Sequence, residues 1–109
     1  MSYKYIFQVK VRAGEDAAFI ESWHNGSIPI QKSLGAMGTR LHKKRGDEHT
    51  YVAIAEWESR EARQAAFAEL DKPGNPLGQE MEKWGHNEDF GEVTLIAEVD
   101  EIDKVFPPQ

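Results

Sequence analysis

One short segment, residues 49–58, carries apolar side chains on both faces that a β-strand would present. Successive side chains of a strand point to opposite faces. The segment therefore divides into two sets, with Tyr51, Ala53, Ala55 and Trp57 on one face and Val52, Ile54 and Glu56 on the other. This composition is typical of a strand that is covered on both sides. The sheet that contains it needs one cover for each face.

A second period-two segment, residues 3–12, supplies another strand of the same sheet. One face holds Tyr3, Tyr5, Phe7, Val9 and Val11, and the other holds Lys4, Ile6, Gln8, Lys10 and Arg12. Aromatic and β-branched residues at this period predict a strand with one well-buried face. Two more strands are predicted: residues 39–44, joined to 49–58 by a hairpin turn at Gly46-Asp47, and residues 92–99, with Val93, Leu95, Ala97 and Val99 on one face.

Helical spacing separates these strands. A first helix begins near Glu15, and residues 24–27 predict an interruption of its pattern. A second short helix would then start with Ser27 as its N-cap and Pro29 in its first turn. Residues 60–70 predict a helix capped by Ser59. Asn75 and Pro76 open a further short helix, which Gly85 closes.

The order strand–helix–strand–strand–helix–strand predicts an α+β fold of the ferredoxin-like type, with one antiparallel four-stranded sheet and helices on one face. We expect residues 1–100 to form this single domain and residues 101–109 to be a C-terminal extension. The face without helices is too apolar to remain in water; it carries Ile6, Gln8, Val52, Ile54, Thr94 and Ile96. A second copy of the sheet would cover it, which predicts a homodimer through sheet-to-sheet packing. The alternative is a monomer whose C-terminal tail covers this face.

Composition excludes several classes of function. A chain of 109 residues is one domain, and its net charge of −6 argues against nucleic acid as a partner. It has no cysteine, which excludes disulfides and thiolate metal sites. No apolar run approaches the ~20 residues of a membrane span, and the first residues lack the layout of a secretory signal. We therefore expect a cytoplasmic protein without a membrane partner.

The chain also lacks the motifs that bind common cofactors. Its histidines, at positions 24, 42, 49 and 86, do not have the spacing of a metal site. It contains no glycine-rich phosphate loop and no serine-nucleophile motif. We expect no metal, flavin or nucleotide cofactor.

Two stretches carry a family resemblance. They are Gly-Ala-Met-Gly-Thr-Arg-Leu at 35–41 and Tyr-Val-Ala-Ile-Ala-Glu-Trp-Glu-Ser-Arg-Glu-Ala at 51–62. Together with the predicted hairpin they resemble the antibiotic biosynthesis monooxygenase family of the dimeric α+β barrel superfamily, over most of residues 3–100. The resemblance implies a two-chain barrel with a ligand pocket in each protomer, between the sheet and its helices.

Members of that family differ in activity. They include cofactor-independent oxygenases that act on phenolic or quinol-like polycyclic substrates, haem-degrading enzymes, and proteins with no known activity. The haem-degrading branch uses an Asn on its first strand, a Trp at the end of its third strand and a His on its second helix. Trp57 matches the Trp, but the Asn position aligns with Phe7, and residues 60–84 contain no histidine. Haem degradation is therefore not expected.

Aromatic side chains are the candidate substrate-binding residues. Trp57 should point toward the helices, and a flat ring could stack in the pocket that these aromatic residues form. The alternative is that they are simply core residues of a small domain. The candidate set is Tyr5, Phe7, Trp23, Tyr51, Trp57 and Trp84.

Three basic residues are candidates for catalysis. If Lys44 pairs with His49 across the hairpin, His42 lies opposite Tyr51 and faces the Trp57 side, where it could act as a general base. Arg40 would then stabilise the resulting oxyanion. A change of one residue in the register would move both side chains to the other face, where they would be a polar or dimer-facing pair. His24 could reach the mouth of the pocket as a base, or its place at a helix end could be explained by the helix dipole alone.

These candidates support three alternative functions. The first is a cofactor-independent monooxygenase, in which the deprotonated aromatic substrate itself supplies electrons to oxygen. The second is a non-catalytic small-molecule binder, or a dimer whose pocket is filled by its own side chains. The third is a stress-related barrel protein that pairs with other proteins.

Overall fold

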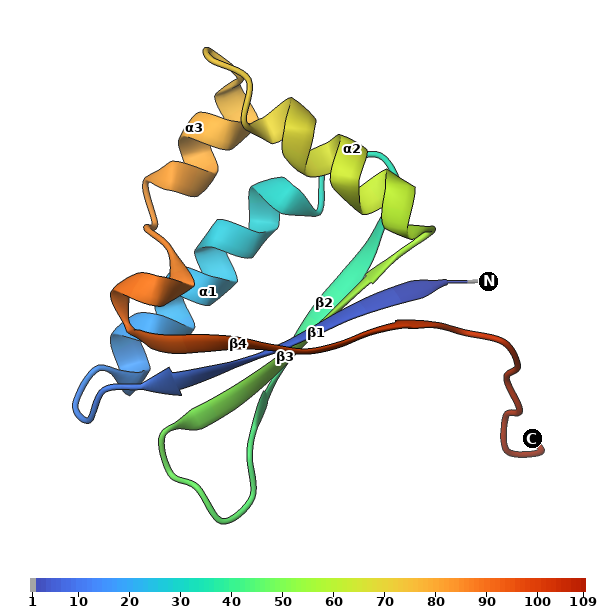
Figure 1. Cartoon of the computed structure of the whole chain (residues 1–109), viewed down its shortest axis with the longest axis horizontal. Coiled ribbons are helices and arrows are strands. Elements are labelled where there is room, and N and C mark those ends of the chain that lie inside the picture. The colour runs from blue at the N-terminus through green and yellow to red at the C-terminus, as the bar shows by residue number, and fades with distance from the viewer. Residues whose placement is uncertain (1) are drawn as a thin grey trace.

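Three helices lie on one side of a four-stranded antiparallel sheet whose strand order is β2-β3-β1-β4 (Figure 1). This computed structural model describes residues 2–109, and it confirms the predicted α+β ferredoxin-like fold. Within this range no helix combines the length and apolarity that crossing a membrane requires. The elements are β1 (Tyr3–Val11), α1 (Asp16–Ile30), β2 (Ala36–Lys43), β3 (Thr50–Trp57), α2 (Arg60–Leu70), α3 (Pro76–Glu82), the short 3-10 helix η1 (Asn87–Asp89) and β4 (Gly91–Asp100).

The predicted caps of α2 and α3 are confirmed. The Ser59 hydroxyl accepts a hydrogen bond of 3.0 Å from the backbone N–H of Ala62. The Asn75 side chain accepts from the backbone N–H groups of Leu77 and Gly78. Each cap satisfies donors that the first turn of a helix leaves unpaired.

The predicted break in the first helix is wrong, because α1 runs without interruption from Asp16 to Ile30. Ser27 lies inside it, and its hydroxyl donates to the carbonyl of Trp23 at 2.6 Å. Pro29 lies in the last turn, where its missing N–H removes only one helical hydrogen bond. The packing of α1 against α3 overrides the local turn preference, and Gly26 lies within this helix beside the Trp84 side chain.

The predicted hairpin register is wrong by one residue. Lys43 pairs with Tyr51 and His42 pairs with Val52. The cause lies in the turn, where the Asp47 carboxylate accepts from the Thr50 hydroxyl and from the His49 N–H. Lys44 therefore bonds to the carbonyl of Thr50 rather than pairing with His49. As a result the side chains of residues 39–43 face opposite to the prediction, whereas Ala36, which lies before an irregularity in the pairing, is opposite Trp57.

A β-bulge divides β4 into two parts. Ile6 pairs with Ala97, whereas Phe7 pairs with Leu95, so Ile96 is an extra residue. The prediction that residues 93, 95, 97 and 99 share one face is therefore wrong beyond the bulge. Glu98 instead lies on the helix side, where its carboxylate accepts from the Tyr3 hydroxyl and from Nε of Arg60.

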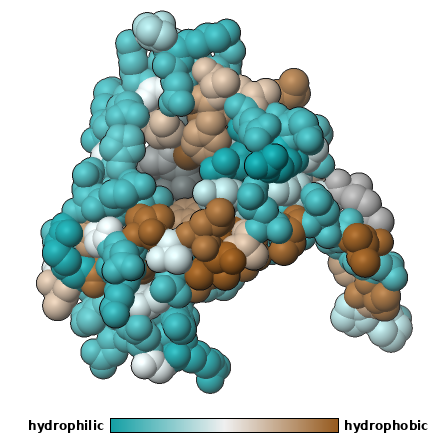
Figure 2. All heavy atoms as spheres, in the orientation of Figure 1, coloured by the Kyte–Doolittle hydropathy of each residue, from teal (hydrophilic) through white to brown (hydrophobic). Residues whose placement is uncertain are grey.

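The sheet face away from the helices is not covered within the protomer. Its side chains include Ile6, Val52 and Ile54, and exposed Ile96 and Val99 lie at the same end of the sheet. After Asp100 the chain has no secondary structure and extends away from the domain as an arm (Figure 1). The arm exposes Ile102, Val105 and Phe106, whose apolar surface is visible in Figure 2. The expected alternative, a tail that covers the sheet, is therefore not what the protomer forms.

Candidate functional site

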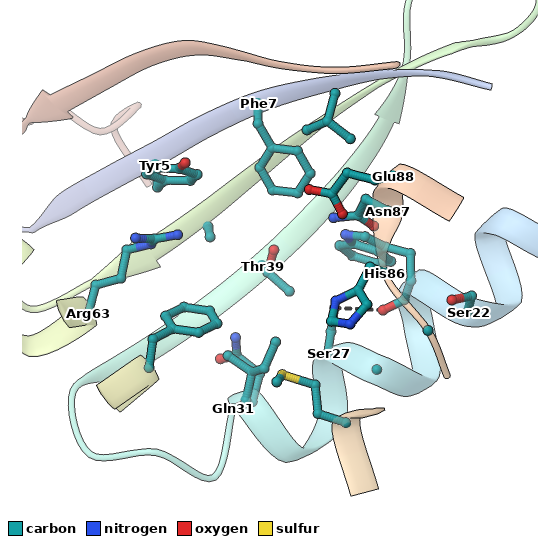
Figure 3. Close-up of a pocket in the computed structure, with 18 of the residues that line it drawn as sticks. Tyr5, Phe7, Ser22, Ser27, Gln31, Thr39, Arg63, His86, Asn87 and Glu88 are labelled. Carbon is teal, nitrogen blue, oxygen red and sulfur yellow. Dashed lines mark hydrogen bonds between the residues drawn. The ribbon is translucent and has the colours of Figure 1, made fainter. Parts of the chain in front are cut away.

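A cavity of about 370 Å³ lies between the sheet and the helices. Binding sites for small molecules commonly begin at about 300 Å³ and are mostly apolar. Strands β1, β2, β3 and β4 form one wall, and α1, α2, the end of α3 and the segment after it form the other (Figure 3). Its aromatic lining comprises Tyr5, Phe7, Trp23, Trp57 and Phe67. The volume and the aromatic lining of the cavity suit a small ring.

Trp57 is the most deeply buried of these aromatic residues, with 1% of its surface exposed. Its ring packs against Phe67 with a centroid distance of 6.0 Å. Its indole N–H is buried and has no hydrogen-bond partner within residues 2–109. An unpaired buried donor is costly, so a ligand acceptor that reached it would remove that cost.

Tyr3 packs beside Trp57 in the core, and Glu98 binds the Tyr3 hydroxyl. Tyr3 packs in the same core cluster as Trp57. Its burial, together with the hydrogen bond to Glu98, raises the pKa of Tyr3 to about 12. The same hydrogen bond, helped by Arg60, lowers the pKa of Glu98. The bulge in β4 thus places Glu98 on the helix side, where its carboxylate binds the hydroxyl of Tyr3 next to Trp57.

Arg63, on α2, places a cation at the cavity wall. Its guanidinium carbon lies 3.7 Å from the ring centroid of Tyr5 and 4.7 Å from that of Phe67. Figure 3 shows the side chain directed toward Tyr5. Arg63 forms no salt bridge with any other residue of the range 2–109. Stacking on two rings therefore orients the guanidinium and leaves its N–H donors available to an anionic oxygen.

The segment after α3 forms the mouth of the cavity. His86 lines it, and Nε2 of its imidazole lies 3.0 Å from a carboxylate oxygen of Glu82 (Figure 3). Asn87 and Glu88 line the same region. The His86 side chain is 57% exposed, so it is in contact with solvent as well as with the cavity. This pair can accept or release a proton at the mouth.

Four of the six predicted aromatic residues line the cavity: Tyr5, Phe7, Trp23 and Trp57. Tyr51 lies in a separate core cluster with Phe19, and its hydroxyl donates to the Asp16 carboxylate at 2.8 Å. Burial and this hydrogen bond raise the pKa of Tyr51. Trp84 is exposed in the turn after α3, and its carbonyl accepts a hydrogen bond from the Ser22 hydroxyl. Neither ring belongs to the cavity lining.

The three predicted catalytic residues do not line the cavity. Arg40 and His42 lie on the sheet face away from the helices, because the register is shifted by one residue and places them opposite Ile54 and Val52. His24 is exposed on α1. The polar groups that do line the cavity include Arg63 and His86, and the sequence did not predict either as part of a site. A signal was available for Arg63, since it is four residues before Phe67 on the same helix and so shares its face.

Metal-ligating side chains are dispersed. No group of three or more His, Asp or Glu residues between positions 2 and 109 is arranged to hold a metal ion.

Comparison with models of protein families gives one match. The model of the antibiotic biosynthesis monooxygenase family matches residues 2–70. No curated protein matches the sequence.

Solved structures share the fold at low identity. A single-residue variant of SnoaB, a cofactor-independent oxygenase from Streptomyces nogalater, superposes with a TM-score of 0.72 at 18% identity, covering 95% of this chain and 96% of that one. A Bordetella bronchiseptica protein assigned to the antibiotic biosynthesis monooxygenases gives 0.71 at 19% identity, with 93% and 97% covered. A Bacteroides thetaiotaomicron protein of unknown function gives 0.68 at 12% identity, with 90% and 95% covered.

Proposed function

Because the chain belongs to the antibiotic biosynthesis monooxygenase family, we propose that it is a cofactor-independent monooxygenase acting on a small phenol-like or quinol-like substrate. The observation that carries the proposal is Arg63, a cation without a salt bridge in the range 2–109 that is stacked on Tyr5 at the wall of an aromatic cavity. An aromatic site with one oriented cation suits a flat ring that becomes an anion. SnoaB, which shares the fold, is a cofactor-independent oxygenase.

The cavity would bind the ring and stabilise its deprotonated form. The ring stacks among Tyr5, Phe7 and Trp57, and its hydroxyl lies near Arg63. Loss of the proton gives a phenolate, which the guanidinium of Arg63 stabilises by charge-assisted hydrogen bonds. The aromatic walls exclude water and so strengthen that interaction. The His86–Glu82 pair at the mouth accepts the proton.

Oxygen then reacts with the bound anion. The phenolate donates one electron to O₂, and the two radicals combine to form a carbon–oxygen bond, which after protonation gives a hydroperoxide on a ring carbon that still carries hydrogen. Loss of water from that carbon leaves a carbonyl. One oxygen atom of O₂ is then in the quinone product and the other is in water. The substrate supplies every electron, so the reaction needs no separate reductant.

Oxygen uptake tests the proposal. The purified protein is supplied with hydroxylated naphthalenes and anthrones, and the wild type is compared with Arg63→Gln and with Arg45→Gln, a control that removes the same charge from the exposed hairpin turn. Loss of one oxyanion donor commonly lowers kcat by about 10²–10³, so Arg63→Gln should lose at least about tenfold in kcat/KM while the control retains full rate. Equal rates in both variants, or no uptake with any of these substrates, would contradict the proposal.

A second candidate function is non-catalytic binding of the same ring. One observation favours it: every carboxylate and imidazole that lines the cavity belongs to an exposed residue, namely Asp71, Glu82, His86 and Glu88. A base in contact with solvent is a weak proton acceptor for chemistry in a buried site. Quenching of tryptophan fluorescence by a naphthol without any oxygen uptake would support binding alone.

We also propose that the active species is a homodimer. Ile6, Val52 and Ile54 form the centre of a sheet face that is uncovered within the protomer. Burying this face against its equal in a second copy would remove apolar surface from water on both chains.

A further inference from the structure

The outer edge of β2 has no partner strand, because β2 is the first strand in the order of the sheet. Such an edge is a template for pairing with another extended chain. Its exposed side chains include Arg40, His42 and Lys43. Within residues 2–109 neither Arg40 nor Lys43 takes part in a salt bridge. The β2 edge thus combines a free strand side with available cations.

The C-terminal arm, residues 101–109, is acidic at its start and apolar further on. It leaves β4 and extends away from its own domain (Figure 1). Ile102 is 85% exposed and Phe106 is 72% exposed, so the protomer gives these side chains no cover. Asp100, at the end of β4, and Asp103 form no salt bridge within the described part of the chain. The arm therefore needs both an apolar contact and cationic partners.

Antiparallel pairing matches this segment to the β2 edge residue by residue. One register sets acids opposite bases and apolar residues opposite apolar residues: Asp100 with Lys43, Glu101 with His42, Ile102 with Leu41, Asp103 with Arg40, and Phe106 with Met37. Opposite charges and apolar side chains that face each other across two strands stabilise a sheet. A parallel arrangement would instead set Asp100 beside Met37 and Phe106 beside Lys43. Pro107 and Pro108, which cannot donate to a strand ladder, follow directly after the matched segment.

The arm cannot pair with β2 of its own chain in this register. Asp100 pairs with Tyr3, at the start of β1. Lys43 pairs with Tyr51, which in turn pairs with Val9, near the end of β1. Asp100 and Lys43 therefore lie at opposite ends and on opposite edges of one sheet. An arm that pairs with β2 in this way has to come from a second copy.

We infer that the arm of each protomer adds as an extra strand to the β2 edge of the other protomer. This inference rests on the proposed homodimer, whose sheet face brings the two chains together. Backbone hydrogen bonds of an added strand supply affinity, and its side-chain pairs fix the register. The Gly38 N–H already donates to the Gln31 side chain, so the new ladder covers residues 39–43 of β2. A two-fold dimer makes the contact twice.

Charge reversal in the full-length protein tests the exchange of arms. Asp103→Arg sets two bases opposite each other, and Arg40→Asp sets two acids opposite each other. Each variant alone should have a dimer dissociation constant about tenfold above that of the wild type at low salt, because the like-charge contact occurs twice in each dimer. An equal mixture of the two variants should regain most of the wild-type affinity. In the mixed dimer the reversed arm meets the reversed edge, and the unchanged arm meets the unchanged edge. Sedimentation equilibrium measures all of these constants.

Two further variants complete the test. Arg45→Asp reverses a charge in the hairpin turn, outside the matched segment, and should dimerise as the wild type does. The double variant Ile102→Ser with Phe106→Ser should weaken the dimer and keep the circular dichroism spectrum, because both side chains are exposed in the protomer. If the wild type is a dimer but mixing the reversed variants restores no affinity, the exchange of arms is overturned and the dimer through the sheet face stands. If the wild type is a monomer at every concentration, both proposals are overturned.

Discussion

The hydrogen bond between Tyr3 and Glu98 should make a measurable and pH-dependent contribution to stability. Tyr3 is 2% exposed and packs against Trp57, and its hydroxyl donates to the Glu98 carboxylate. Tyr3→Phe keeps the ring and removes only that hydroxyl. Hydrogen bonds to charged groups contribute about 1.5–3 kcal/mol. Because Arg60 still pairs with Glu98, we expect a loss of about 2 kcal/mol at neutral pH, in the lower half of that range.

The sign of the pH dependence follows from the raised pKa of Tyr3. The pKa is about 12 in the folded protein, against 10.0 for an ordinary tyrosine. At a pH between these values the unfolded chain loses the phenolic proton while the folded protein keeps it. The stabilisation of the folded protein by the Tyr3–Glu98 hydrogen bond is therefore complete below about pH 10 and is lost as the pH rises toward about 12. This difference in pKa corresponds to about 3 kcal/mol of unfolding free energy. Because Glu98 is partly exposed to solvent, the expected contribution of the hydrogen bond to stability is about 2 kcal/mol.

Urea unfolding followed by circular dichroism measures this effect. The difference in unfolding free energy between the wild type and Tyr3→Phe is determined at intervals from about pH 8 to pH 12, so that lysine titration, common to both proteins, cancels. The difference should narrow steadily above about pH 10. Tyr5→Phe, which removes a phenol from the same strand, serves as the control. A difference that stays constant across this range would refute the reasoning.

Three further predictions concern other parts of the fold. Gly78→Ala should destabilise the folded protein by about 1–3 kcal/mol or more in thermal unfolding, because the new Cβ would lie 1.9 Å from the Leu70 carbonyl oxygen of α2. Gly26→Ala is the control: its new Cβ would have its nearest contact at 3.6 Å, so this variant should be neutral or stabilising. Asp16→Asn should lower stability above pH 4 and have less effect in acid. The pKa of Asp16 is lowered, chiefly by the hydrogen bond from the Tyr51 hydroxyl, so the stabilising charge of Asp16 is lost as the pH falls. Urea unfolding above pH 4 and in acid checks this difference. Ile54→Lys should reduce the dimer fraction in light scattering without lowering the helix content seen by circular dichroism, and an unchanged mass would contradict the proposed dimer face.

The sequence was sufficient to predict the elements that depend on local patterns. The two sets of side chains in residues 3–12 alternate as the structure has them, because a strand's period admits only two faces. Ser59 and Asn75 cap their helices because a short polar side chain directly before a helical segment can accept hydrogen bonds from the unpaired N–H groups of the first turn. The aromatic lining from Tyr5, Phe7 and Trp57 follows from the same alternation.

Features that depend on tertiary contacts were not predictable in this way. The hairpin register follows from the hydrogen bonds of Asp47 with the residues at the start of β3, and a pattern of apolar residues does not contain that information. The continuity of α1 depends on its packing against α3. The position of Arg63 over Tyr5 depends on how α2 crosses the sheet, and a charged residue on a short helix is ordinarily expected to face water.

The extra residue Ile96 divides β4 into a part that lines the cavity and a part that contacts α2. Before it, Val93 and Leu95 line the cavity. After it, the Glu98 carboxylate accepts a hydrogen bond from Arg60 at the start of α2. Because of the extra residue, odd-numbered side chains face the helices before Ile96 and even-numbered side chains face them after it. Because Leu95 pairs with Phe7 and Ala97 pairs with Ile6, loss of Ile96 alone would make the strand regular and leave Glu98 on the helix side.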